Sequence, residues 1–181
     1  MPVLPESLTL RGRGVVLRDW RDDDVPVFEA VCGDPDVCRF TSVPWIYNRS
    51  DVLEWVARVG ANRRAGLGIA LAITQPGAGT ALGNVNLVRF SDASRTAALG
   101  YWVVPAARRN GLAVAAARLL CEWGFAELNL TSIELAVPPD NIASHRVGAR
   151  LGATNEGLRR DSHEADGRKW DMTVYALTPT C

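Results

Sequence analysis

Residues 99–113 carry the most information about the fold, and they read LGYWVVPAARRNGLA. The segment from Ala98 to Val104 is almost continuously apolar, which is typical of a buried strand. A polar turn follows, and the apolar residues from Leu112 onward recur at helical spacing. The sequence therefore predicts a buried strand that runs through a turn into the N-terminus of a helix.

This predicted helix start has the properties of an anion site. The first N–H groups of a helix have no partner inside it, and the positive end of the helix dipole lies there. Gly111 lets a ligand approach the backbone, and Arg108 and Arg109 add local positive charge. A pyrophosphate fits these features, although Arg-Arg-Asn-Gly is also an ordinary turn before a helix.

Outward from this segment, apolar spacing predicts the remaining elements. Strands are expected at 15–17, 69–73, 81–88, 98–104, 133–137, 154–158 and 172–177. Helices are expected at 22–32, at 50–59 with Ser50 as N-cap, at 111–128, and at 141–151 with Gly152 as C-cap. The result is one α+β domain over residues 1–181, with a mixed, mostly antiparallel sheet of about seven strands and about four helices.

Composition limits the partners of this domain. Twenty Lys and Arg balance twenty Asp and Glu, so no global field attracts nucleic acid or an anionic membrane. The four cysteines lack zinc-site spacing and are expected to be reduced thiols, with no metal bound. No signal peptide and no membrane-spanning run occur in the sequence, so a cytoplasmic protein is expected, as a monomer or homodimer.

Five ordered markers resemble the GNAT (GCN5-related N-acetyltransferase) superfamily. Its coenzyme A loop has the pattern Arg/Gln-x-x-Gly-x-Gly/Ala, which Arg108, Gly111 and Ala113 match. The chain most resembles the branch that acetylates the N-termini of ribosomal proteins. The markers are VLRDWRDDD at 16–24, GDPDV at 33–37, LGYWV at 99–103, PDNIAS at 139–144 and LGA at 151–153.

The resemblance implies a GNAT fold, with the sheet splayed at the cofactor site, and acetyl-CoA or another acyl-CoA as co-substrate. It implies that backbone amides of the turn hold the pyrophosphate and that the strand before it pairs with the pantetheine amides. The residues concerned are Val103 and Val104 on the strand, and Arg108, Arg109, Asn110, Gly111, Leu112 and Ala113 on the turn.

The same resemblance implies that Asn141 binds the cofactor arm and that Ser144 lies near the thioester sulfur. A hydroxyl there can stabilise or protonate the leaving thiolate, which makes Ser144 the catalytic candidate. From the residues alone, Asn141 is also a good N-cap, and Ser144 is also compatible with a solvent-facing position in the first turn.

Three departures from the family pattern leave the general base open. Ala98 stands where many relatives carry a Glu, Gly148 where many carry a Tyr acid, and Ala153 where a Phe is usual. Among the remaining ionisable residues, His145 is first interpreted as a surface histidine. The other candidates are Asp19, Asp92, Glu134, Asp161, His163 and Glu164, which the sequence does not rank.

The acceptor site is expected near segments without a periodic core pattern. Trp45 and Tyr47 lie in an aromatic stretch that suits a lid, and His163 lies in a polar loop expected at 159–169. Trp20 and Trp170 also fall near loops where acceptor walls form, although core packing explains most tryptophans. The acceptor is expected to be a small-molecule amine or a protein N-terminus.

The leading functional hypothesis is direct acyl transfer from a CoA thioester to an amine. A strand amide near Val103 stabilises the oxyanion, and Ser144 assists departure of the thiolate. One alternative is a longer acyl-CoA or an acyl-carrier protein as donor, since Ala98, Gly148 and Ala153 leave space. A second alternative, which Ala98 and Gly148 suggest, is an acyl-CoA sensor without catalysis.

Overall fold

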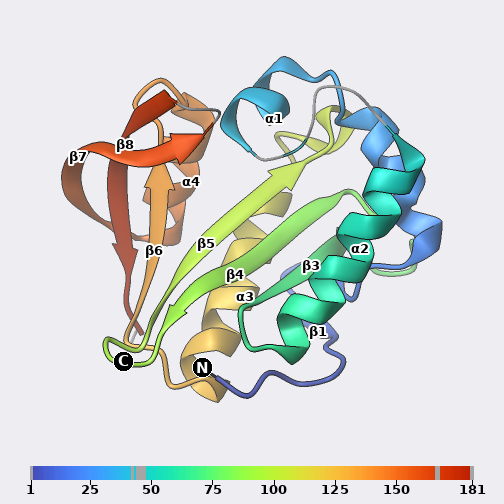
Figure 1. The fold of residues 1–181 in the computed structure, drawn as a ribbon, viewed down its shortest axis with the longest axis horizontal. Coiled ribbons are helices and arrows are strands. Elements are labelled where there is room, and N and C mark those ends of the chain that lie inside the picture. The colour runs from blue at the N-terminus through green and yellow to red at the C-terminus, as the bar shows by residue number, and fades with distance from the viewer. Residues whose placement is uncertain (1, 42, 44–47, 166–167, 180–181) are drawn as a thin grey trace.

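The computed structural model describes residues 2–41, 43, 48–165 and 168–179, and these form an eight-stranded sheet with helices on both faces (Figure 1). The strand order is β1-β2-β3-β4-β5-β6-β8-β7, and all neighbours are antiparallel except β5 and β6. The strands are β1 (Leu10–Gly12), β2 (Val15–Arg18), β3 (Gly68–Thr74), β4 (Gly83–Ser91), β5 (Thr96–Val103), β6 (Ser132–Val137), β7 (Thr154–Ala165) and β8 (Arg168–Leu177).

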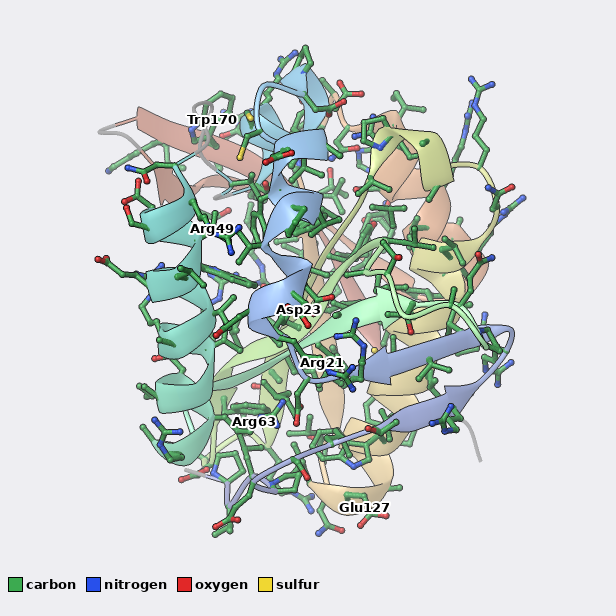
Figure 2. The ribbon with its side chains drawn as sticks, turned by 90° about the vertical axis from the view of Figure 1, so that its right-hand side faces the viewer. Arg21, Asp23, Arg49, Arg63, Glu127 and Trp170 are labelled. Carbon is green, nitrogen blue, oxygen red and sulfur yellow. The ribbon has the colours of Figure 1, made fainter. Side chains whose placement is uncertain are left out.

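Helices cover the two faces of this sheet. One face carries α2 (Arg49–Arg64) and the 3₁₀ helix η1 (Asp22–Ala30), and the opposite face carries α3 (Leu112–Glu127) and α4 (Ile142–Leu151). Figure 2 shows α2, marked by Arg49 and Arg63, on the other side of the sheet from α3, which ends at Glu127. Two short helices, α1 (Pro35–Phe40) and the 3₁₀ helix η2 (Pro105–Ala107), complete the described part.

Local signals explain where the main helices begin and end. The side chain of Asn48 caps α2 by accepting from the Ser50 amide at 3.0 Å, so the N-cap lies two residues before the predicted Ser50. Gly152 ends α4 in the left-handed conformation (φ 78°), as predicted from glycine's freedom at this position.

An aromatic cluster forms the core between the sheet and α2. Trp20 contacts Phe28, Trp55 and Trp102 with ring centroids 5.3 to 5.9 Å apart. Such pairs contribute about 0.5 to 1.5 kcal/mol each beyond the area they bury. Trp20 is therefore a core residue rather than a wall of an acceptor site, because these rings leave it only 8% exposed.

The parallel contact between β5 and β6 is short, and the two strands diverge beyond it (Figure 1). Three residue pairs join them, ending at Ala98 and Glu134, although β5 continues to Val103 and β6 to Val137. The sheet is thus splayed at the end of β5 that leads into α3, as the family resemblance implied.

Two parts of the fold differ from the sequence-based expectation. The strand β1 and the helix α1 were not predicted, because each is too short to show a periodic pattern. The segment expected as a polar loop at 159–169 instead extends β7 and β8, which pair as far as Ala165 and Arg168. An edge hairpin that is polar along both strands lacks the alternation by which strands are identified.

None of the helices in the described part of the chain has the length and apolar character needed to cross a membrane.

Candidate active site

The start of α3 faces the splayed part of the sheet with an uncapped N-terminus. Gly111 holds the N-cap position at φ 76°, and Arg109 before it is also left-handed at φ 65°. Among the described residues, no side chain caps the helix and no atom lies within 4 Å of a Cβ built at Gly111, and the first turn contains no acidic residue. No hydrogen bond between described residues uses the amides of residues 109–114, so these donors remain for a ligand.

The two arginines of the turn differ in their surroundings. Arg109 is exposed, whereas Arg108 is half-buried and donates to Asp34 at 2.7 Å and to the Val103 carbonyl at 3.2 Å. Asp34 is the N-cap of α1; burial raises its pKa, but hydrogen bonds from Arg108 and the Val37 amide outweigh this and lower it. Arg108 therefore ties the turn to α1.

The backbone of the last β5 residues is unevenly available. Val104 donates its N–H to Leu82 at 2.9 Å and accepts from Ala107 at 2.9 Å, so neither group is open to a ligand in this structure. Hydrogen-bonding directions alternate along a strand, so Val103 and Tyr101 turn their N–H groups away from β4. Of the two predicted residues, Val103 and Val104, Val103 is therefore the one whose amide faces the gap, by which we mean the space between the diverging strands β5 and β6.

The remaining predicted turn residues line the same start of α3. Leu112 is buried and anchors the first turn in the core, whereas Ala113 is half-buried. Asn110 is exposed, and its side-chain amide donates to the Ala107 carbonyl at 3.4 Å. Small or backbone-directed groups thus leave the turn amides uncovered.

The start of α4 lies across the gap and is capped. Asn141 accepts from the Ser144 amide at 3.0 Å, so the N-cap interpretation of Asn141 is correct as a description of its side chain. An ion pair between Arg39 of α1 and Asp140 joins α1 to this loop, while Arg108 joins α1 to the α3 turn. The short helix α1 is therefore bonded to both segments expected to hold the cofactor.

A buried hydroxyl from β5 meets Ser144. The Tyr101 hydroxyl has no hydrogen-bond partner of ordinary geometry among the described residues, yet it interacts with Ser144. Burial raises the pKa of Tyr101 to about 12, and Ser144 lowers it to a smaller extent. Tyr101 is therefore protonated at working pH, and its donor is available to a group entering beside Ser144.

The opposite face of the sheet carries a second buried polar atom without a partner. Asn86 pairs with Gly100 across β4 and β5, and its side-chain oxygen is buried without a hydrogen bond among the described residues. A Cβ at Gly100 meets that oxygen at 2.5 Å, so only glycine leaves room for Asn86. The strand segment therefore presents an acceptor of hydrogen bonds on the α2 face and a donor, Tyr101, on the α3 face.

One carboxylate adjoins the beginning of the gap. Glu134 on β6 pairs with Ala98 on β5, and this is the last pair before the strands diverge. Its side chain is 37% exposed and accepts from Arg159 at 2.7 Å. Arg159 also contacts Glu156 at 3.0 Å.

The ring of His145, the residue after Ser144 on α4, is held by two hydrogen bonds. Its Nε2 lies 3.2 Å from the Pro139 carbonyl, which only accepts, so Nε2 carries a proton. In the neutral ring Nδ1 then accepts from the Tyr175 hydroxyl at 2.8 Å. A Cβ at Gly148 lies 3.3 Å from the Tyr175 ring, which occupies the space that a Tyr at 148 needs. His145 thus fastens the loop before α4.

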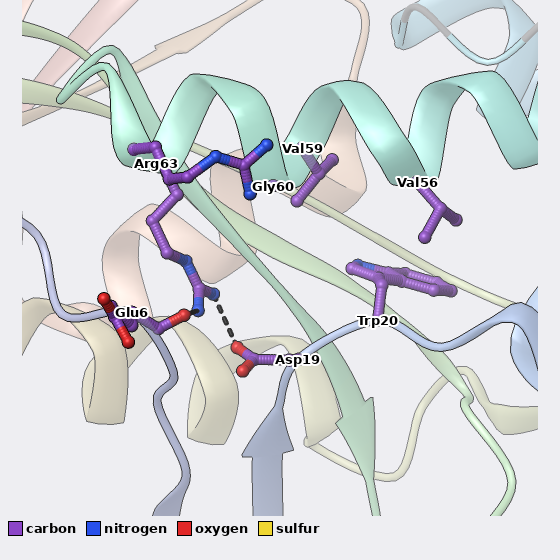
Figure 3. Close-up of a pocket in the computed structure, with 8 residues that line it drawn as sticks. Glu6, Asp19, Trp20, Val56, Val59, Gly60 and Arg63 are labelled. Atoms are coloured by element: carbon purple, nitrogen blue, oxygen red, sulfur yellow. Dashed lines mark hydrogen bonds and ion pairs between the residues drawn. The ribbon is translucent and has the colours of Figure 1, made fainter.

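A cavity of about 310 Å³ lies away from the gap, between α2 and the segment after β2 (Figure 3). Asp19 belongs to this cavity, where it forms an ion pair of 2.6 Å with the buried Arg63 and accepts from the Leu8 amide at 3.3 Å. The Asp19 carboxylate is therefore paired with Arg63, and it lies apart from the groups at the gap.

Of the three residues predicted to bind the acceptor, Trp45, Tyr47 and His163, the structure describes only the backbone of His163. Trp45 and Tyr47 lie outside the described residues. The backbone of His163 lies on β7 opposite Trp170, and the structure does not describe its side chain.

Three polar residues on β5 and its two neighbouring strands were not singled out as a group from the sequence: Asn86, Tyr101 and Glu134. Tyr101 lies inside the quoted 99–113 segment, and Glu134 was one of several unranked carboxylates. Their proximity depends on strand register, which the sequence does not state. Among the described residues, no group of three or more His, Cys, Asp or Glu side chains is arranged to hold a metal ion.

Comparisons with known proteins identify the family and the fold of the chain. Residues 15–154 match the family model described as "Acetyltransferase (GNAT) domain". The chain is 24% identical over 163 residues to "Uncharacterized N-acetyltransferase YoaA" of Bacillus subtilis (strain 168), covering 90% of this chain and 92% of the relative.

Solved structures with similar folds include Mycobacterium smegmatis RimJ in complex with CoA-disulfide. The TM-score is 0.82 at 25% identity, over 95% of this chain and 86% of that one. The ribosomal-protein-S5-alanine acetyltransferase from Vibrio fischeri has a TM-score of 0.78 at 16% identity, over 94% and 96% of the two chains. The second likeness concerns the fold.

Proposed function

The chain belongs to the GNAT acetyltransferase family, and from that premise we propose that it transfers an acetyl group from acetyl-CoA to the α-amino group of a protein N-terminus. The observation that supports acetyl-CoA as the acyl donor is the uncapped N-terminus of α3 beside the gap between β5 and β6. Its unpaired amides, with Arg109 beside them, suit a pyrophosphate. RimJ, which is 25% identical, is a relative solved with a CoA derivative.

The cofactor arm enters the gap between β5 and β6 in this proposal. The Val103 amide, which faces the gap, donates to the pantetheine or to the thioester carbonyl. Asn141 and Ser144 approach from α4, with Tyr101 beside them on β5. Hydroxyl and amide donors around a thioester stabilise negative charge as it develops in the transition state.

Two arguments support a protein N-terminus as the acceptor. One is the pKa of an α-amino group, and the other is the resemblance to enzymes that act on ribosomal-protein N-termini. An α-amino group has a pKa of about 8, so about a tenth of it is neutral at pH 7. A lysine side chain, with a pKa of about 10.4, is neutral in less than about 0.1% of molecules at pH 7. The site needs less assistance to use an α-amine, and the Asn86 oxygen can accept a hydrogen bond from it.

The test is product analysis by mass spectrometry with acetyl-CoA and two sets of peptides. One set has a free N-terminus and no lysine, and the other has a blocked N-terminus and an internal lysine. We expect acetylation of the first set only. Acetylation confined to lysine contradicts the proposed acceptor, and binding of coenzyme A without turnover of any amine favours the sensor alternative. Faster transfer from a longer acyl-CoA or an acyl-carrier protein favours the alternative donors.

A further inference from the structure

We propose that Glu134 is the general base that deprotonates the acceptor amine. The inference rests on the proposed function and adds to it the residue that accepts the proton. An α-amine is mostly protonated at neutral pH, and an ammonium group has no lone pair with which to attack a thioester. A carboxylate beside the gap, on the face away from the cofactor helices, meets this need.

Strand register puts Glu134 at that position. Glu134 and Ala98 are paired in the parallel contact between β5 and β6, and paired residues direct their side chains to the same face. Ala98 shares its face of β5 with Gly100 and Trp102, because successive side chains alternate. That is the α2 face, where Trp102 contacts Trp20 and where Asn86 covers Gly100.

The opposite face belongs to the cofactor side. Ile133 and Leu135, the neighbours of Glu134 on β6, are buried, and Ile133 lies close to Gly124 of α3. The amine and the thioester therefore meet at the gap from opposite faces, with Glu134 on the amine's side. Since the pair Ala98 and Glu134 is the last before the divergence, no further strand contact separates Glu134 from the opening.

Ala98 leaves the space that Glu134 needs. A Glu at 98 fills the position between the two strands, whereas alanine has a single methyl group and is 8% exposed. Glu134 carries its carboxylate on β6, directly across the strand pair from Ala98 on β5. Neighbouring strands lie about 4.8 Å apart, a distance that one water molecule bridges.

Arg159 positions Glu134 without removing it from use. The pair is half-exposed, with side-chain exposures of 50% and 37%, and exposed ion pairs contribute little net free energy. Arg159 shares its charge with Glu156 as well. The Glu134 carboxylate can therefore turn from Arg159 to an incoming ammonium group at small cost.

The ammonium nitrogen loses one proton to Glu134, directly or through one water, and the freed lone pair forms the C–N bond to the thioester carbonyl carbon. The attacking nitrogen then carries a positive charge and releases its second proton to solvent. The C–S bond breaks, and the electron pair leaves on sulfur as the thiolate of coenzyme A, with Ser144 as hydrogen-bond donor. Glu134 passes its proton to solvent before the next cycle.

The experiment is the pH profile of kcat/KM for Glu134→Gln with a free N-terminal peptide and acetyl-CoA. Without the base the variant depends on the neutral amine, so its deficit relative to the parent should be about 10-fold at pH 7 and about 100-fold at pH 6. At pH 9, where the amine is already neutral, the two enzymes should converge. The KM for acetyl-CoA should not change, because Glu134 lies on the amine's face.

Glu156→Gln is the matched control, because it removes the other carboxylate on Arg159 and should leave the profile of the parent. A second variant, Glu134→Gln with Ala98→Glu, moves the carboxylate back across the strand pair and should restore activity at pH 6. A parent-like profile for Glu134→Gln, or an equal loss at every pH, overturns the proposal. Neither result affects the proposed function if the parent acetylates N-terminal peptides, so the two can fail separately.

Discussion

The helices α3 and α4 begin on opposite sides of the same gap, but their first turns are built differently. At α4 the side chain of Asn141 accepts a hydrogen bond from the Ser144 amide, and the Ile142 amide donates to the Asp140 carbonyl. At α3 the N-cap is Gly111, which has no side chain, and the first amides have no partner among the described residues. The first amides of α4 are hydrogen-bonded within the protein, whereas the first amides of α3 are available to a ligand.

This difference separates two tasks that a CoA-dependent enzyme must perform. An uncapped helix start with no acidic residue in its first turn attracts an anion and holds it through backbone donors. A capped start is rigid, so it can present one side chain, here the Ser144 hydroxyl, in a fixed direction. Binding strength is therefore expected to depend on α3, and turnover on α4.

The largest expected effect is the loss of coenzyme A binding in Gly111→Glu. The substitution puts a negative charge and a side chain at the proposed phosphate contact, so affinity measured by calorimetry should fall roughly 100-fold or more. Gly77→Glu is the matched control, because Gly77 has a similar φ of 78° and equally open surroundings. Both variants carry the same backbone strain, of about 1 to 2 kcal/mol. Equal affinity in the two folded variants contradicts the placement at α3.

The next effect is on turnover rather than on binding, and it is expected for Ser144→Ala. Thiolate charge develops only as the tetrahedral intermediate collapses, so a donor aimed at sulfur stabilises the transition state more than the bound thioester. We expect kcat to fall roughly 10- to 1,000-fold, with the KM for acetyl-CoA within about twofold. Steady-state kinetics should show no such loss for Ser50→Ala, which removes a hydroxyl from the first turn of α2, away from the candidate site. Unchanged turnover in Ser144→Ala refutes the role.

The smallest effect is expected for Asn141→Ala, and it tests whether the cap has a second task. Loss of the hydrogen bond to Ser144 should lower the free energy of unfolding by about 1 kcal/mol, measured by urea denaturation. Asn48→Ala removes the equivalent cap from α2 and should cost a similar amount. If Asn141 also binds the cofactor arm, only its variant raises the KM for acetyl-CoA. A change confined to stability shows that Asn141 is a cap alone.

Sequence patterns predicted the parts of the fold that are long or periodic. The helix α3 and the strand β6 follow their apolar spacing closely, and Gly152 ends α4 at the expected residue. The helix α1 was missed although Asp34 followed by Pro35 is a helix start signal that the sequence contains. For a short helix this signal is the only one, because six residues do not complete a periodic face.

The candidate site was predictable to the extent that it lies in one continuous segment. Local sequence and the family resemblance predicted a cofactor turn at Gly111 and roles for Asn141 and Ser144, and these roles stay predictions. Asn86 was not named, and Glu134 was named only as one of several unranked carboxylates, because their relation to Gly100 and Ala98 exists only across strands whose register depends on the whole sheet. Long-range pairing of this kind has no signature in a single sequence.

The brief contact between β5 and β6 also has a consequence for how the chain folds. The hairpin of β7 and β8 and the consecutive strands β3, β4 and β5 form through contacts between near neighbours in sequence. The parallel pair needs the whole of α3 to cross over first, and loop-closure entropy delays contacts of that kind. The junction between the two halves of the sheet is thus expected to assemble late. A ligand seated there stabilises contacts that are absent from the folding transition state, so it acts by slowing unfolding and leaves the folding rate nearly unchanged.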